Sequence, residues 1–219
     1  KPLTSKTVSG VISHNNNTSV LTIARLNRVK QIRYSDLAKW TDNFNKRNIL
    51  GAGRFGEVYR CNADNDTIGN AAVKRFRLSL LNAEAGTNYS LMSMQTEIDV
   101  LSSFNHPNII RLLGCCAEGN SATGNFCLVY ELGTRGDLHK AINSDAMCRE
   151  MTWDIRIRIV LGVTSALNYL HCHRDEHVYH RDVKSANIVL MDDFTPKLID
   201  CGLAKYIDGD GTGVDCKSG

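Results

Sequence analysis

A change of pattern along the chain limits the fold more than any other feature. From about residue 45 to residue 131, short apolar runs alternate with Gly, Asn and Asp, which is typical of strands joined by turns. Beyond Gly136 the apolar residues recur at helical spacing, as in the stripe that contains Ile155, Ile159 and Val163. Because the strands are gathered ahead of the helices and do not alternate with them, the pattern predicts an α+β fold.

The strand-rich part predicts a five-stranded antiparallel sheet with one main helix. The helix falls between the third and fourth strands, where Met94, Ile98 and Leu101 recur at helical spacing before Pro107 ends the pattern. The expected strands cover residues 48–51, 57–61, 70–76, 109–116 and 126–131.

Two further helices are expected outside this sheet. A short helix is expected over residues 34–44, with Ser35 as its N-cap, and a long helix follows Thr152, which can cap it. The longest apolar run, residues 159–173, is shorter than the roughly 18 residues that cross a bilayer. The sequence therefore predicts no transmembrane helix.

The charge of the chain is unevenly distributed. The first 35 residues hold six of the 26 bases and no acid, so the 20 bases and 23 acids that follow leave residues 36–219 with a net charge of −3. We expect residues 1–32 to form a basic, flexible arm that would suit an anionic membrane face. The eight cysteines are irregularly spaced without a C-x-x-C pair, which favours free thiols.

A glycine-rich segment opens the expected sheet. Gly51, Gly53, Gly56 and Val58 fit the pattern G-x-G-x-x-G-x-V, in which glycines let backbone N–H groups approach phosphate oxygens. A dinucleotide-binding fold uses similar glycines, but it follows them with a helix, whereas a strand pattern follows Gly56. An ordinary glycine-rich hairpin remains an alternative at this point.

A lysine and a glutamate add charge to this pattern. Lys74 lies on the third expected strand, where a fixed ammonium can neutralise phosphate charge, and Glu97 on the following helix is its natural partner. A lysine on a strand or a glutamate on a helix is by itself an ordinary surface residue.

The decisive segment is His180-Arg181-Asp182-Val183-Lys184-Ser185-Ala186-Asn187, which Asp200-Cys201-Gly202 follows thirteen positions after Asn187. Together with the glycine loop, the strand lysine and the helix glutamate, this order resembles that of protein kinases. A metal site built from the nearby histidines and Cys172 is the weaker alternative, because the segment lacks zinc-ligand spacing.

The resemblance implies ATP and Mg²⁺ as the small-molecule partners. Lys74 would contact the α and β phosphates and pair with Glu97, while Asp182 would accept or orient the proton of the substrate hydroxyl. Asn187 and Asp200 would hold Mg²⁺, which prefers hard oxygen ligands. The residues expected to surround the nucleotide are Gly51, Ala52, Gly53 and Gly56 in the lid, Val58 and Ala72 above the adenine, Val189 below it, and Tyr130 and Glu131 in the connector.

The substrate class follows from the same resemblance. Lys184, two residues after Asp182, is the residue that Ser/Thr kinases carry there, so a protein with Ser or Thr acceptors is the expected substrate and no nucleic acid is expected. The finer resemblance, which covers residues 33–207, is to plant receptor-like kinases of the wall-associated-kinase-like group. It rests on segments such as Arg33-Tyr34-Ser35-Asp36-Leu37 and Cys127-Leu128-Val129-Tyr130-Glu131.

This family implies the domain organisation and the location of the chain. Residues 33–219 would form a bilobal kinase domain, with an N-lobe over residues 45–131 and a partial C-lobe over 136–219, truncated after the D-x-G motif. Residues 1–32 would lie beside a membrane, on the cytoplasmic side of the plasma membrane, tethered if a transmembrane segment precedes residue 1.

Two departures from the family pattern favour an inactive alternative. Cys201 stands where kinases carry Phe, and a large-to-small change in such a stack costs about 2 to 4 kcal/mol if the site cannot collapse. We therefore expect weakened packing around Cys201, between Leu101 and His180. The resemblance also leads us to expect a C-lobe without its later helices. A pseudokinase or scaffold that binds nucleotide or a partner protein without transfer is accordingly the second hypothesis.

Overall fold

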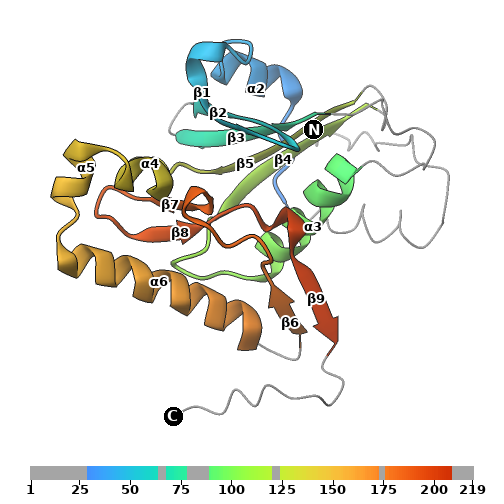
Figure 1. Cartoon of the computed structure of the whole chain (residues 1–219). Coiled ribbons are helices and arrows are strands. Elements are labelled where there is room, and N and C mark those ends of the chain that lie inside the picture. The colour runs from blue at the N-terminus through green and yellow to red at the C-terminus, as the bar shows by residue number, and fades with distance from the viewer. Residues whose placement is uncertain (1–28, 64–67, 78–88, 120–123, 173–175, 209–219) are drawn as a thin grey trace, which may run out of the picture.

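The computed structural model describes residues 29–63, 68–77, 89–119, 124–172 and 176–208. They form a β-rich part and a helical part, as the sequence predicts (Figure 1). The strands of the first part are β1 (Ile49–Gly53), β2 (Gly56–Asn62), β3 (Asn70–Phe76), β4 (Leu112–Glu118) and β5 (Asn125–Glu131). The α-helices within the described residues are α2 (Tyr34–Trp40), α3 (Tyr89–Ser103), α4 (Leu138–Ile142), α5 (Asp145–Glu150) and α6 (Trp153–Cys172).

The five strands form one antiparallel sheet in the order β1-β2-β3-β5-β4. The five-stranded sheet and its single main helix, α3, were both predicted. Because residues alternate between the two faces of a strand, β3 directs Lys74 and Phe76 to the face covered by α3 and Val73 to the opposite face. The sheet therefore separates two apolar clusters, and the inner one surrounds the candidate site.

The outer face of the sheet is covered by α2 and the turn after it. Here the predicted N-cap is wrong: Arg33 precedes the helix, and its guanidinium pairs with Asp36 at 2.9 Å, so Ser35 lies inside the first turn. The helix also ends earlier than predicted, at Trp40. Thr41 closes it, because its hydroxyl donates to the Leu37 carbonyl and accepts from the backbone N–H of Phe44.

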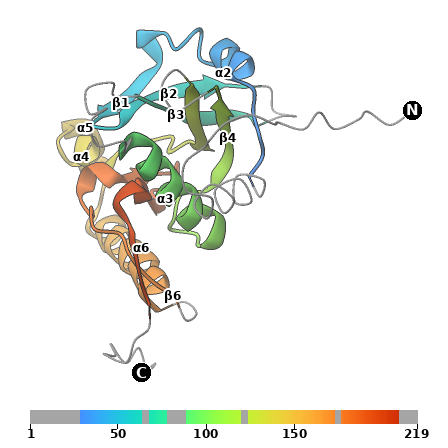
Figure 2. The same cartoon turned by 90° about the vertical axis from the view of Figure 1, so that its right-hand side faces the viewer.

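The segment that leads into α2 runs along the edge of the sheet (Figure 2). Gln31 bridges to Cys115 of β4 in parallel, and the Ile32 N–H donates to the Cys115 carbonyl at 2.8 Å. A Cβ at Gly114 would lie 2.9 Å from the Lys30 carbonyl oxygen as well as 2.4 Å from Ile32 Cδ1, so the close approach of the two backbones favours glycine there. Most of the basic arm predicted over residues 1–32 lies outside the described residues.

Helix α6 is the long helix predicted after Thr152. Its buried residues are Ile159, Ala166 and Leu170, which lie on one face, while Val160 and Leu161 are exposed. No helix among the described residues is both long and apolar enough to span a bilayer.

Two small antiparallel ribbons were not predicted. One pairs β6 (Glu176–Tyr179) with β9 (Lys205–Asp208), and the other pairs β7 (Ile188–Leu190) with β8 (Pro196–Leu198). Strands of three or four residues are too short for an alternating pattern to stand out from the loops around them.

The prediction of free thiols is wrong for Cys172, which is disulfide-bonded. Irregular spacing in the sequence does not exclude a disulfide, because the bond depends on proximity in space. The free cysteines among the described residues are Cys61, Cys115, Cys116, Cys127, Cys148 and Cys201.

Candidate functional site

A buried lysine lies between two carboxylates where β3, α3 and the D-C-G turn meet. The Lys74 ammonium is 2.8 Å from Glu97 Oε2 and 2.7 Å from Asp200 Oδ1. The side chains of Lys74 and Glu97 are 10% and 2% exposed, whereas that of Asp200 is 33% exposed. The structure thus brings together three of the predicted site residues from segments up to 126 positions apart.

The charges of this cluster support one another. Burial lowers the pKa of Lys74, but the carboxylates of Glu97 and Asp200 outweigh it and raise the pKa above its usual value. The lysine therefore stays an ammonium at neutral pH. Burial raises the pKa of Glu97, and the ammonium of Lys74 opposes that rise. Asp200 keeps its exposed surface, so this carboxylate remains open to a further cation.

Asp182 is held by two neighbours in the loop before β7. Its Oδ2 accepts hydrogen bonds from Lys184 Nζ at 2.7 Å and from Asn187 Nδ2 at 2.8 Å. The hydrogen bond from Lys184 is the main reason why the pKa of Asp182 lies below its usual range. The carboxylate is therefore ionised at neutral pH, partly exposed and fixed in direction, as a proton acceptor must be.

Backbone contacts tie this loop to the D-C-G turn. The Ile199 N–H donates to the Asn187 carbonyl at 3.0 Å, and the His180 ring lies 2.9 Å from the Ile199 carbonyl through Nε2. Asp200, the next residue, adopts the left-handed conformation with φ 65°, which is uncommon for a residue with a side chain. The strained residue is the one that carries the exposed carboxylate.

The metal ligands implied by the sequence are Asn187 and Asp200. Among the described residues, no group of three or more His, Cys, Asp or Glu side chains is arranged to hold a metal ion. One carboxylate and one amide suit an ion that completes its shell with phosphate oxygens and water, as Mg²⁺ does. The chemistry of the donor set fits this ion, while a zinc site built from the histidines around Cys172 lacks support.

The glycine-rich segment forms the hairpin between β1 and β2. Gly53 pairs with Gly56, and Gly51 pairs with Val58. A Cβ at Gly56 would lie 2.0 Å from the Arg75 carbonyl oxygen, so packing alone demands glycine there. A Cβ at Gly51 or Gly53 would meet nothing within 4 Å. Packing among the described residues therefore does not require glycine at these two positions, which leaves the backbone there accessible, as the predicted phosphate contact needs.

The residues predicted to hold the adenine lie on both sides of the connector after β5. The cross-strand pairs place Val58 opposite Lys74 and Ala72 opposite Tyr130, so Val58, Ala72 and Lys74 share the inner face of the sheet. On the other side, Val189 of β7 lies under the connector, where a Cβ at Gly133 would come within 2.5 Å of Val189 Cβ. Ala52, at the lid, is exposed.

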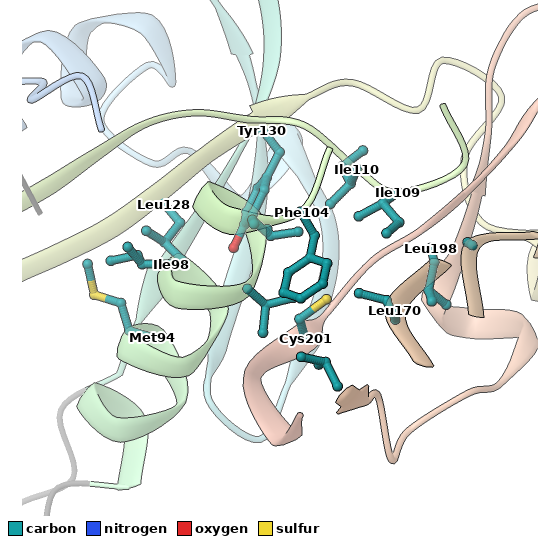
Figure 3. Close-up of a cluster of buried hydrophobic side chains, with 14 of the residues drawn as sticks. Met94, Ile98, Phe104, Ile109, Ile110, Leu128, Tyr130, Leu170, Leu198 and Cys201 are labelled. Carbon is teal, nitrogen blue, oxygen red and sulfur yellow. The ribbon is translucent and has the colours of Figure 1, made fainter. Parts of the chain in front are cut away.

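The two connector residues lie in β5. Glu131 ends the strand and binds Lys197 Nζ at 2.9 Å, and its backbone N–H donates to Arg111. The Tyr130 side chain is buried and points toward α3 (Figure 3). Burial and the nearby Glu97 carboxylate raise the pKa of this phenol. Sequence reasoning missed the contact of Tyr130 with the inner core, because its face depends on the sheet register.

Cys201 is fully buried in the inner core. It belongs to the same apolar cluster as Leu101, Phe104 and Tyr130 (Figure 3). The next residue, Gly202, packs against α3 so closely that a Cβ there would lie 2.1 Å from Ser93 Oγ. The turn is therefore closely packed against α3, although a small thiol stands where the kinase motif has a phenyl ring.

This geometry agrees with comparisons with known proteins. The sequence model of the family described as "Protein kinase domain" matches residues 44–217. The chain belongs to the protein kinase family. Kinases of this family use ATP together with a divalent metal ion.

The most similar relatives of this kinase include plant receptor-like kinases from Arabidopsis thaliana. It is 40% identical over 181 residues to the L-type lectin-domain containing receptor kinase VIII.1, covering 83% of this chain and 23% of that protein. It is 36% identical over 177 residues to the receptor-like serine/threonine-protein kinase ALE2, covering 81% and 22%. It is 37% identical over 172 residues to the wall-associated receptor kinase-like 14, covering 78% and 22%.

These matches confirm the resemblance to a plant receptor-like Ser/Thr kinase domain. The chain spans about a fifth of the length of these three relatives. The roles of individual site residues stay predictions, which the geometry above makes specific.

Proposed function

We propose that this kinase transfers the γ-phosphoryl group of ATP to Ser or Thr hydroxyls of proteins. The observation that carries the proposal is the position of the Lys74 ammonium, 2.8 Å from Glu97 and 2.7 Å from Asp200. Lys74 lies opposite Val58, the last residue of the glycine-rich pattern. A fixed positive charge beneath a glycine lid is suited to phosphate oxygens.

The transfer step requires an acceptor for one proton. The oxygen of the substrate hydroxyl forms a bond to the γ-phosphorus, and the bond from that phosphorus to the β–γ bridging oxygen breaks, leaving ADP. The hydroxyl proton passes to the ionised carboxylate of Asp182. Lys184 and Asn187 hold this carboxylate in one orientation, so catalysis depends on positioning and charge neutralisation.

Asn187 and Asp200 would hold Mg²⁺. When bound, this ion neutralises the charge that develops on the phosphate oxygens. Asp200 is suited to the task because it keeps exposed surface while Lys74 fixes its other oxygen. The side-chain amide nitrogen of Asn187 donates to Asp182, which leaves the amide oxygen of Asn187 to bind the ion.

The biological setting follows from the relatives and from the N-terminal charge. Receptor-like relatives favour a signalling kinase on the cytoplasmic side of the plasma membrane. The acid-free stretch of residues 1–35 suits a position beside anionic lipids. Membrane tethering requires a transmembrane segment ahead of residue 1.

A second function is favoured by one observation, the cysteine at position 201. If packing around Cys201 does not hold Asp200 in place during turnover, the protein binds nucleotide or a partner protein without transfer. Isothermal titration with ATP and Mg²⁺, together with measurement of ADP formed in the presence of a Ser/Thr acceptor, separates the two functions. A scaffold that binds nucleotide binds ATP but produces no ADP even when the acceptor is present.

The substrate class and the metal are tested by transfer to three peptides that carry only Ser, only Thr or only Tyr. We expect transfer to the Ser and Thr peptides, its loss on chelation by EDTA, and its recovery with Mg²⁺. The Asp200→Asn variant should not recover with Mg²⁺. Transfer to the Tyr peptide alone, or transfer that survives chelation, would contradict the proposal.

A further inference from the structure

The inner core contains an aromatic ring close to the cysteine that replaces the motif phenylalanine. Phe104 and Cys201 are 4% and 0% exposed and belong to one cluster. The Cys201 side chain is directed toward the Phe104 ring, between α3 and the D-C-G turn (Figure 3).

Phe104 also contacts two other elements, α6 and β9. Its ring packs edge-on against Tyr169 of α6, with centroids 6.0 Å apart, and lies 6.5 Å from the ring of Tyr206 in β9. It therefore connects α3 to the helical part of the domain and to the strand that follows the D-C-G turn. In kinases with the D-F-G sequence, packing of the Phe distinguishes active from inactive arrangements.

The backbone of α3 couples Phe104 to Glu97, the partner of Lys74. The Phe104 N–H donates to the Val100 carbonyl at 2.9 Å, so the residue continues the last turn of α3. Phe104 follows Glu97 by seven positions, which places both on the same face, about two turns apart. A ring anchored in the core at one end of this face limits rotation of α3, and with it the position of Glu97 beside Lys74.

We propose that Phe104 is a positioning residue that replaces the absent aromatic at position 201. Its ring fills the space between α3, α6 and the D-C-G turn, and this packing keeps Glu97 and Asp200 on either side of Lys74. The inference rests on the proposed phosphoryl transfer only for its kinetic readout. Packing complementarity between residues 104 and 201 is a separate property of the fold.

The test moves the aromatic ring from position 104 to position 201 in the full-length protein. Phe104→Leu leaves a cavity, Cys201→Phe crowds the ring of Phe104, and the double variant again places one aromatic ring in this space. We expect each single variant to lower both kcat and the unfolding midpoint in urea, and the double variant to recover most of each. For two residues in contact, the folding equilibrium constant of the double variant should differ from the product of the two single effects by a factor of roughly 2 to 150.

Two further variants keep the test decisive. Phe44→Leu makes the same substitution in the outer cluster, so its effect should add to that of Cys201→Phe without coupling. If Cys201→Phe does not fold, Cys201→Leu replaces it in the same cycle. A positioning role also requires that kcat changes more than the KM for ATP, since the glycine lid and adenine contacts are untouched.

Some results would overturn the inference. Additive effects of the substitutions at 104 and 201 would show that the two side chains do not share a space. A rise in activity on Cys201→Phe alone would show that the cysteine leaves the core underpacked and that Phe104 does not compensate for it. If the native protein transfers no phosphate, the unfolding midpoints still test the inference. Coupled midpoints mean that the side chains at 104 and 201 share one space, and additive midpoints mean that they do not.

Discussion

Lys74 is a buried charge that depends on its partners. The Lys74→Met variant leaves the Glu97 side chain, which is 2% exposed, without its cation. Breaking a buried pair in this way costs roughly 3–5 kcal/mol of unfolding free energy. Phosphoryl transfer should also fall by about 100- to 1,000-fold, because an oriented charge at the phosphates is lost. Urea denaturation and transfer assays measure the two effects.

The stability loss of this variant should depend on pH. Without Lys74, burial raises the pKa of Glu97 above its unfolded value, so the folded state binds the proton more tightly. The variant is therefore most stable below the unfolded pKa and loses stability as pH rises toward the folded pKa. Replacing Glu97 by Gln in the same variant should remove this dependence, whereas a pH-independent loss would contradict the assigned pair.

Lys184 controls the ionisation of Asp182. Because its hydrogen bond is the main cause of the low pKa, Lys184→Met should move the Asp182 pKa upward. A carbon-13 NMR titration of the Asp182 carboxyl group measures the shift. Lys140→Met is the control, since Lys140 of α4 pairs with a different carboxylate, that of Asp137 at the N-cap of the helix, at 3.0 Å. An unchanged Asp182 titration in the Lys184 variant would show that the hydrogen bond does not persist in solution.

At the scale of single residues, the sequence predicts which types occur but not what they touch. Lys74, Glu97 and Asp182 were identified because the glycine-rich segment, the strand lysine, the helix glutamate and the H-R-D segment occur in the order that protein kinases share. The side chain of Tyr130 and the ring of Phe104 could not be placed in this way. Their neighbours come from α3, α6 and the D-C-G turn, so they depend on long-range packing that no local pattern encodes.

At the scale of elements, two glycines of the β1–β2 hairpin test different properties: packing requires glycine at Gly56, whereas Gly51 is expected to affect ligand binding alone. Gly56→Ala places a Cβ 2.0 Å from the Arg75 carbonyl oxygen and should destabilise the protein by about 1–3 kcal/mol. Gly51→Ala meets nothing within 4 Å, so the unfolding midpoint should stay unchanged while ATP affinity falls.

Thermal unfolding and calorimetric titration of ATP distinguish the two variants. If Gly51→Ala left ATP affinity intact, the space above Gly51 would not be the nucleotide site.

The β1–β2 hairpin was predictable because turn residues and strand alternation agree locally. The ribbons formed by the three- and four-residue strands β6 to β9 were not predictable, because they depend on pairing between segments that are distant in the sequence.

At the scale of the whole molecule, α6 presents an apolar surface opposite its buried face. Trp153, Val160 and Leu161 are 74%, 59% and 62% exposed. Exposed apolar patches of this kind favour association. Replacing Val160 and Leu161 by Gln should reduce light scattering at high protein concentration and change stability by no more than about 0.5 kcal/mol.

The buried face of the same helix provides the control. Leu170→Ala should cost about 2–5 kcal/mol, because Leu170 has no exposed surface. A similar loss from the Val160 and Leu161 substitutions would mean that these side chains are packed in solution.

The most direct test of the proposed activity measures transfer of the γ-phosphate of ATP to a Ser/Thr acceptor protein, by the native chain and by its Asp182→Asn variant. The amide keeps the shape of the carboxylate but cannot accept the hydroxyl proton, so the native chain should label the acceptor and the variant should not. Equal labelling by both, or none by folded native protein that binds ATP, would contradict a working phosphotransferase with Asp182 as its proton acceptor.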